Sequence, residues 1–250
     1  MKVSNPSINK MQDYCYGGES TESLASYRGV ALKTLFFCGI AFVSALVTYI
    51  LLFNFIPSST LVLMIGLGGV GALVFGFIAS LSRDTVKITG ALYCLCEGLL
   101  IGAVSAICDA AYRGVVLISL LSTLVTLGIM VALYAFGVVK VGHKFRSFMT
   151  TALISIVFIQ LIVFLLSLFI PAVYRLFYGD CWFAMLVSAG MVLFVSLFLL
   201  MDLDDIARMV DGGMIKKYEW NAAYSLSLSV LWLYLEFLEL FVRIFGRSRD

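Results

Sequence analysis

The sequence predicts an all-α polytopic membrane protein with seven transmembrane helices, the last of them central in the bundle. Hydrophobic residues make up 62% of the chain and charged residues 13%, whereas soluble domains have about 45–50% and about 25%. From Gly29 onward seven apolar stretches follow one another, each roughly 20 to 26 residues long, and a bilayer core of about 30 Å needs about 20 helical residues per crossing. No soluble core holds that much apolar surface, so we expect these stretches to cross a membrane.

The seven stretches divide the chain into one membrane domain and two tails. Residues 1–28 are polar and lack the short apolar segment and cleavage site of a signal peptide, so we expect a polar cytoplasmic tail. Residues 29–245 form the predicted seven-helix membrane domain, and residues 246–250 form a short basic tail. The expected crossings are 29–53, 58–81, 88–108, 114–139, 147–171, 181–201 and 222–241.

Proline and polar residues limit the crossings. Pro57 separates the first from the second, and Pro171 ends the fifth. The third crossing carries one acid, Glu97, near its middle, and the sixth ends in the acid-rich sequence LLMDLDDI (199–206). The polar content of the seventh indicates a helix surrounded by protein instead of lipid, so we expect it at the centre of the bundle. Its polar residues include Ser225, Ser227, Ser229, Glu236 and Glu239.

Basic residues divide unevenly between the two sides of the predicted bundle. Short cytoplasmic loops retain Lys and Arg, so the richer side predicts a cytoplasmic N-terminus, whereas the other side's loops hold only Arg113 and Arg175. Seven crossings place the basic C-terminal tail on the outer side, which the same rule disfavours. Whether the last segment crosses the membrane completely therefore stays an open question. The richer side holds Lys2, Lys10, Arg28, Arg83, Lys87, Lys140, Lys144, Arg146, Arg208, Lys216 and Lys217.

Composition argues against several functional classes. The net charge of +2, without a basic run, argues against nucleic acid as a partner. A single histidine, His143, leaves little from which to build a metal cluster or a Ser-His-Asp site, and the six cysteines are scattered. We therefore expect no enzyme activity and no bound cofactor.

The sequence GLGGVG (66–71) matches the Gly-x-Gly-x-x-Gly pattern of dinucleotide-binding turns, which requires a strand before it in a soluble βαβ unit. Here the pattern lies inside an apolar crossing. Gly68, Ala72 and Gly76 recur every fourth residue and give one face of small residues, which lets a neighbouring helix approach closely. We interpret the motif as a helix-packing face.

Charged residues inside the crossings are candidates for function because they are costly there. Glu97 is expected to be protonated, paired or facing water, so a neutral hydrogen-bonded acid and a role in an ion pathway both stay open. Glu236 and Glu239 lie three residues apart on one helix face, which suits a shared proton or cation. Arg83 and Lys87 lie where snorkelling residues are usual, and either is a candidate counter-charge for acids at the same end.

Three acids crowd the end of the sixth crossing, where the negative end of the helix dipole disfavours them. Arg208 follows Asp204 by four residues and Asp205 by three, so a solvated ion pair accounts for these two acids. Asp202 lies deeper and has no such local partner. Asp202 is therefore the strongest functional candidate of the three.

These segments resemble the transmembrane Bax inhibitor motif family, also called the Bax inhibitor-1 family, and in particular its bacterial branch. The matching sequences are LMDLDDI (200–206), LYLEFLELF (233–241), KKYEWNAAY (216–224) and the stretch 90–102. The likeness covers nearly the whole chain from Arg28 onward. It implies a multi-pass protein of a bacterial plasma (inner) membrane, with six helices around a central last one and a pH-sensitive leak of calcium.

The resemblance also implies site residues. In relatives a carboxylate near the end of the sixth helix pairs with one in the seventh, and an arginine near the end of the second helix approaches them. By motif these positions are Asp202, Glu236 and Arg83. The chain departs from the family pattern because Glu236 replaces an aspartate and Glu239 stands where relatives often carry asparagine.

The leading hypothesis is a calcium leak gated by Asp202 and Glu236. Two carboxyls at hydrogen-bonding distance share a proton because they do not readily both ionise. Loss of that proton replaces attraction by repulsion and opens an acidic path in which calcium binds transiently to the two acids. Protons and calcium are thus the expected partners, besides the lipid bilayer, and a higher cytoplasmic pH is expected to increase the leak.

Other functional classes stay open. An intramembrane aspartyl protease also uses two acids on adjacent helices, but the chain lacks the Gly-x-Gly-Asp motif of that class. A proton-coupled exchanger of small solutes accords with buried acids, although no proline breaks a predicted helix at its middle. A non-conducting regulator that acts by protein contact is compatible with everything above.

Overall fold

The computed structural model describes residues 24–54, 58–82, 84–139, 141–170, 173, 177 and 182–247. Within them, seven long helices form an all-α bundle, in agreement with the predicted crossings to within a few residues at most boundaries. The helices are α2 (Tyr27–Asn54), α3 (Ser58–Leu81), α4 (Val86–Ala111), α5 (Val115–Ala135), α6 (His143–Ser167), α8 (Trp182–Asp211) and α9 (Glu219–Arg247), with a short 3-10 turn, η1 (Lys216–Tyr218), before α9.

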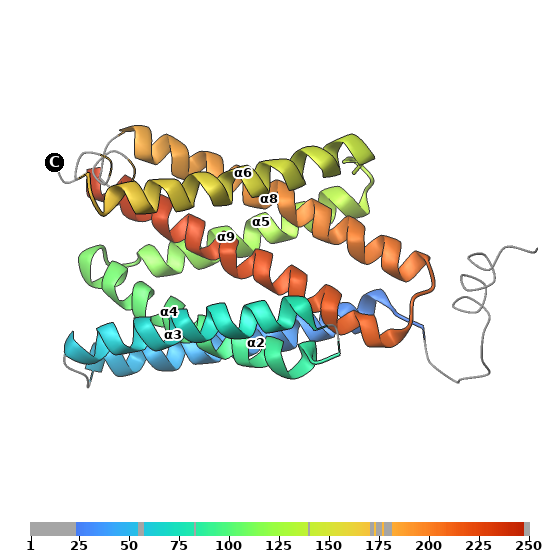
Figure 1. Cartoon of the computed structure of the whole chain (residues 1–250), viewed down its shortest axis with the longest axis horizontal. Helices are drawn as coiled ribbons and strands as arrows, with labels where there is room; N and C mark the ends of the chain where they lie inside the picture. Colours follow the sequence, from blue (N-terminus) through green and yellow to red (C-terminus); the bar gives the residue numbers. More distant parts are fainter. Residues whose placement is uncertain are drawn as a thin grey trace, which may run out of the picture.

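The last helix is central, as predicted. In Figure 1, α9 runs obliquely across the bundle, with α2, α3 and α4 on one side and α6 and α8 on the other, and α5 crosses behind it. It packs against α2, α4, α5 and α8. Six described helices are long and apolar enough to cross a membrane, and α9 is not among them. Several of its polar side chains, including Ser227, Ser229 and Glu236, are buried in the bundle.

The outer helices present apolar side chains to their surroundings. Only 11% of the apolar window of α6 is buried inside the protein, against 39% of that of α4. Along α6 the exposed side chains are large and hydrophobic, as expected for contact with lipid. They include Phe148, Ile154, Val157, Phe158, Leu161 and Phe164.

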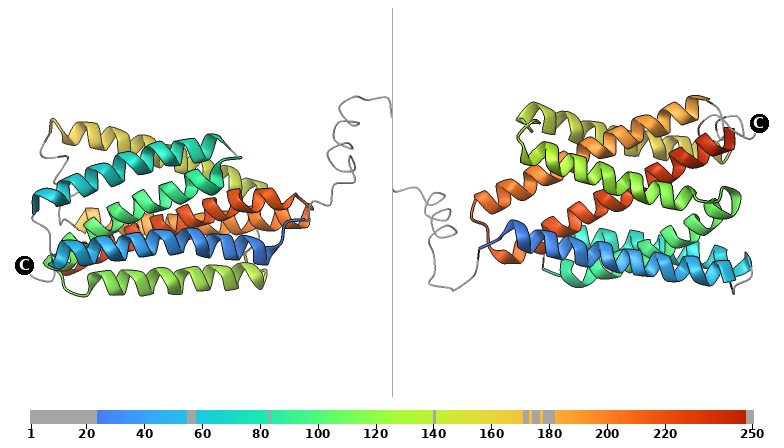
Figure 2. Two further views of the ribbon diagram at one scale, coloured as in Figure 1. Left: turned by 90° about the horizontal axis from the view of Figure 1, so that it is seen from below. Right: turned by 180° about the vertical axis from the view of Figure 1, so that it is seen from behind.

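The α9 helix extends from one end of the bundle to the other. At its first residue, Glu219 accepts a hydrogen bond from the backbone N–H of Ser26, just before α2. Near its last turn, Arg243 donates a hydrogen bond to the carbonyl oxygen of Ala184 at the start of α8. Figure 2 shows the two ends of α9 at opposite ends of the bundle. The last helix therefore runs the full length of the bundle.

Small residues let α4 lie close to its two neighbours. An added Cβ at Gly98 would lie 2.5 Å from the carbonyl oxygen of Ala41 in α2. An added Cβ at Gly68 would lie 3.0 Å from the carbonyl oxygen of Cys96 in α4. The GLGGVG motif thus packs α3 against α4, which confirms the interpretation of its small-residue face.

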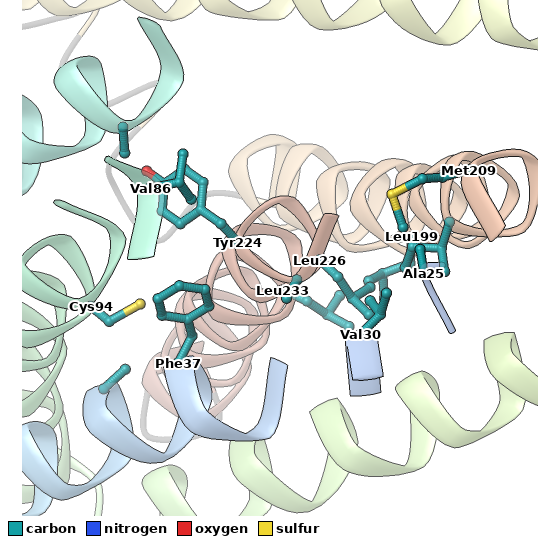
Figure 3. Packing of buried hydrophobic residues seen from close by; sticks show 14 of the residues in the cluster. Ala25, Val30, Phe37, Val86, Cys94, Leu199, Met209, Tyr224, Leu226 and Leu233 are labelled. Carbon is teal, nitrogen blue, oxygen red and sulfur yellow. The ribbon is translucent and has the colours of Figure 1, made fainter. Parts of the chain in front are cut away.

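The largest buried cluster surrounds the first half of α9. The ring of Phe37 in α2 makes edge contacts with Trp220 and Tyr224 of α9, with ring centroids 5.7 Å and 6.0 Å apart. On another side of α9, Leu233 joins the same cluster as Leu199 of α8. Figure 3 shows both groups of side chains around α9. This apolar packing fixes the position of α9 beside α8, where polar side chains meet.

Candidate functional site

Polar and charged side chains follow the contact between α8 and α9 from one end of the bundle to the other. Ser225, Ser229, Glu236 and Arg243 of α9 are separated by four, seven and seven residues, which places them on one face of the helix. On α8 the buried polar residues are Ser188, Ser196, Asp202 and Asp204. The α8–α9 seam, as we call it, comprises the buried Ser188, Asp202, Ser229, Glu236 and Arg243 together with Ser225, which is exposed.

Asp202 forms a polar cross-link between the two helices. Its side chain is buried, with 4% exposure. One carboxyl oxygen accepts a hydrogen bond from the hydroxyl of Ser225 at 3.0 Å, and the other accepts one from the hydroxyl of Ser229. Both oxygens of this acid are thus satisfied by α9, and α8 and α9 are held together where the seam begins.

The predicted contact between Asp202 and Glu236 is not formed in this structure. Asp202 lies nine residues before α8 ends at Asp211, and nine residues from the start of α9 at Glu219 lead to position 228. In an antiparallel hairpin such positions face each other, so Asp202 meets Ser225 and Ser229. Glu236 lies seven residues beyond Ser229, which is about 10 Å along a helix.

Glu236 has its own partners within α9. It is buried, with 8% exposure, and accepts a hydrogen bond of 2.8 Å from the indole N–H of Trp232. Glu239 is half exposed and forms an ion pair with Arg243 one turn later. Both glutamates lie in the half of α9 farther from Asp202, and Arg243 lies near both, since it pairs with Glu239 and interacts electrostatically with Glu236.

A pocket of about 410 Å³ opens beside Asp202 at the junction of α8, η1 and α9. Asp205, Asn221 and Ser225 contribute oxygen atoms to its lining. The side-chain oxygen of Asn221 is buried and has no hydrogen-bond partner among the described residues. The pocket gives the Asp202 end of the seam a route to solvent, with a wall that carries acidic and amide groups.

The two acids next to Asp202 are held by arginines from two helices. Arg208 pairs with Asp204 at 2.6 Å, as their spacing predicts. Arg146 of α6 also binds Asp204, at 2.8 Å, and pairs with Asp205. The expected partner of Asp205 was Arg208, but the arginine from α6 takes that place. These ion pairs attach α6 to the end of α8.

Of the remaining candidates, Glu97 and Lys87 lie in α4, away from the seam. Glu97 is half-buried in α4, where the hydroxyl of Tyr93 forms a hydrogen bond to it. Lys87 lies over the ring of Trp220, 5.4 Å from the centroid, so its partner here is aromatic. Arg83 lies outside the described residues. No group of three His, Cys, Asp or Glu side chains in the described part of the chain is arranged to hold a metal ion.

Sequence reasoning missed the serines and the arginine of the seam as functional partners. Ser225 and Ser229 were visible as polar residues of the last crossing, but their link to Asp202 follows from the hairpin register. Arg243 was not assigned a role. The seven-residue spacing from Ser229 through Glu236 to Arg243 is the signal that identifies one polar face.

Comparison with known proteins gives one match. A family model described as Bax inhibitor 1 like matches residues 5–246. Neither the curated proteins nor the solved structures include a match.

Proposed function

The chain belongs to the Bax inhibitor 1 like family, and we propose that it is a pH-sensitive leak pathway for calcium along the α8–α9 seam. The observation that carries the proposal is the cross-link from Asp202 to Ser225 and Ser229 beside a pocket. Ionisable groups buried in membrane domains usually serve ion or proton pathways. A single titratable group that joins two helices at the mouth of a polar seam is suited to control access to it.

The chemistry of the seam favours a hard cation. Calcium binds oxygen ligands, above all carboxylates. Asp202 and Glu236 supply carboxylates at two positions along the seam. The hydroxyls of Ser225 and Ser229 lie beside Asp202. We propose that a passing ion meets the two acids in succession, since conduction needs sites that bind weakly enough to release the ion. In this proposal the two acids act one after the other on the passing ion, and they do not share a proton as the resemblance implied.

Protonation of Asp202 gives the expected direction of the pH response. With its proton, Asp202 is neutral and donates one of its two hydrogen bonds to a serine hydroxyl, which suits a side chain that is only 4% exposed. Without it, a charge lies on this buried side chain close to Asp205, which is costly unless water or a cation reaches it through the pocket. The open arrangement is then favoured, so calcium flux is expected to rise with pH on the Asp202 side.

We propose that the Asp202 end of the bundle faces the cytoplasm. Basic residues from several elements lie at this end, including Arg146 of α6, Arg208 of α8 and Lys217 of η1, which form ion pairs there. Lys33 of α2 and Lys87 of α4 lie there as well, with both ammonium groups over the ring of Trp220. Cytoplasmic ends of membrane proteins are enriched in Lys and Arg, which supports an N-terminus on the same side.

The other functional classes are less well supported. An aspartyl-protease mechanism needs two facing carboxyls, whereas Asp202 and Glu236 lie about two helical turns apart. A proton-coupled exchanger would use the same buried acids, and saturable counterflow that depends on a solute would identify it. A non-conducting regulator would leave the vesicles tight to calcium at every pH.

Calcium flux into proteoliposomes tests the proposal, from about pH 6 to about pH 8. We expect a flux that rises with pH in the native protein and loses its pH dependence in Asp202→Asn. Glu236→Gln is expected to lower the flux while its pH dependence is kept, because Glu236 lies along the path and not at the cross-link. Asp211→Asn is the matched control, since Asp211 lies exposed at the end of α8 and accepts a hydrogen bond from the hydroxyl of the exposed Tyr27. A full pH response in Asp202→Asn would refute the gate.

A further inference from the structure

Arg243 closes the α8–α9 seam at the end opposite Asp202. Its side chain is buried, with 8% exposure. The guanidinium donates hydrogen bonds to the carbonyl oxygens of Ala184, at the start of α8, and of Phe177, at 2.9 Å, in the preceding segment. It also forms an ion pair with Glu239. A planar cation with five donors is thus held by groups from two parts of the chain.

The neighbouring position on α8 is polar and unsatisfied. Ser188 lies one turn after Ala184, and its side chain is buried, with 2% exposure. Its hydroxyl oxygen has no hydrogen-bond partner among the described residues. A buried hydroxyl without a partner is costly in a packed apolar contact. It is therefore a buried polar position one helical turn from Ala184, whose carbonyl oxygen accepts a hydrogen bond from Arg243.

We propose that Arg243 is the second closure of the seam and its barrier to cations, an inference that rests on the proposed function. A fixed positive charge in a narrow path of low dielectric constant repels passing cations, as arginines do in other selective pores. Passage then requires the guanidinium to leave the carbonyl oxygens of Ala184 and Phe177. The bonds of Arg243 also join α9 to the start of α8, so the same movement separates the two helices.

The two closures differ in their response to pH. The guanidinium keeps its charge throughout the physiological range, whereas Asp202 is a carboxylic acid that exchanges a proton. The Arg243 closure therefore sets how much the seam conducts, and the Asp202 closure sets how conduction varies with pH. Neutralising Arg243 is expected to raise the flux at every pH and to leave the pH dependence in place.

Accessibility of position 188 tests the closure without any measurement of calcium. Ser188→Cys protein in lipid nanodiscs is treated with a cationic, membrane-impermeant thiol reagent, and peptide mass spectrometry measures the label at position 188. We expect Arg243→Gln to increase the labelling rate about tenfold or more, because it removes both the charge and the fork of donors. Arg247→Gln is the matched control, since Arg247 is the exposed last residue of α9.

Further variants separate charge from folding. Arg243→Lys keeps a positive charge, so labelling by the cationic reagent is expected to stay close to the native rate. If Arg243→Gln does not reconstitute, Glu239→Gln carries the test, because it removes the acid that offsets the charge of the guanidinium. Labelling by the cationic reagent is then expected to fall below that of Arg247→Gln. Equal rates in Arg243→Gln and Arg247→Gln, or in Glu239→Gln and Arg247→Gln if the first does not fold, would overturn the proposal.

Calcium flux in the same variants distinguishes this failure from failure of the proposed function. A pH-dependent flux in the native protein that is unchanged in Arg243→Gln, with no added labelling, refutes the closure and keeps the leak. Increased labelling at position 188 without calcium flux in any variant keeps the closure and refutes the calcium leak.

Discussion

Lys33 of α2 and Glu219, the first residue of α9, form an ion pair with 2.5 Å between Nζ and Oε2. The Glu219 side chain is fully buried. It also accepts hydrogen bonds from the backbone N–H and the hydroxyl of Ser26, at 2.8 Å and 3.3 Å. This carboxylate therefore joins the start of α2 to the start of the central helix, and it anchors the end of the bundle where Asp202 lies.

Removing the charge of Glu219 is expected to destabilise the bundle. In Glu219→Gln the ammonium of Lys33 loses its counter-charge in a site that is only 15% exposed. Breaking a buried pair costs about 3–5 kcal/mol, and we expect a loss of folding free energy near the lower limit, because Lys33 retains some access to water. Unfolding in detergent micelles, followed by temperature or denaturant, measures the loss.

An exposed ion pair at the same end supplies the control. Lys217 and Asp84 are also 2.5 Å apart, but their side chains are 59% and 76% exposed. Surface pairs contribute about 0–1 kcal/mol, so Asp84→Asn is expected to have little effect. Equal losses in Asp84→Asn and Glu219→Gln would contradict the assignment of the stability to burial.

The same carboxylate gives the bundle a pH-dependent stability. Burial raises the pKa of Glu219, but the hydrogen bonds from Lys33 and Ser26 lower it by more, so the pKa lies below its usual value. The stabilisation is therefore fully present above the unfolded pKa of about 4.3 and is lost as pH falls through the folded pKa. We expect the stability difference between the native protein and Glu219→Gln to shrink below about pH 4. A difference that stays constant to lower pH would show that the carboxylate charge is not its source.

Two glycines of the α2 and α4 pair are expected to respond oppositely to alanine. A Cβ at Gly102 of α4 would overlap the carbonyl oxygen of Ala45 and would lie 2.8 Å from Cβ of Thr48. Gly102→Ala is therefore expected to cost about 1–3 kcal/mol of folding free energy through overpacking. Gly39→Ala in α2 has no atom within 4 Å of its added Cβ and is expected to be neutral or to stabilise by up to about 1 kcal/mol. Thermal unfolding of both variants checks the contrast, and a similar loss in each would contradict it.

The helices could be predicted from the sequence because the apolar runs themselves set their lengths. The predicted second crossing coincides with α3, Ser58–Leu81. The sixth was expected to end at Met201, whereas α8 continues to Asp211. Hydropathy marks only the apolar part of a helix, while the i,i+4 pair between Asp204 and Arg208 supports the polar extension beyond it.

The partners of the acids could not be predicted in the same way. The position that faces Asp202 depends on where α8 ends and on the length of the connection to α9. The predicted end of the sixth crossing at Met201 gives the wrong value for both, because α8 continues to Asp211. Asp205 and Glu219 bind Arg146 and Lys33, which are distant in sequence. Several acids and bases gather at this end of the bundle, so residue spacing alone does not select the pairs.

The serines of the cross-link provide the last test of the gate. Ser229→Ala, alone or with Ser225→Ala, leaves Asp202 buried with fewer hydrogen bonds, which costs about 1–3 kcal/mol for an unsatisfied buried group. If the cross-link holds the seam closed, this loss falls on the closed state, so calcium flux at about pH 6 is expected to rise toward its value at about pH 8. Ser227→Ala is the matched control, because Ser227 is buried on α9 but donates its hydrogen bond to the carbonyl oxygen of Ala223 in the same helix. A flux in the Ser225→Ala and Ser229→Ala double variant that matches that of Ser227→Ala at both pH values would mean that Asp202 acts on the seam without these hydroxyls.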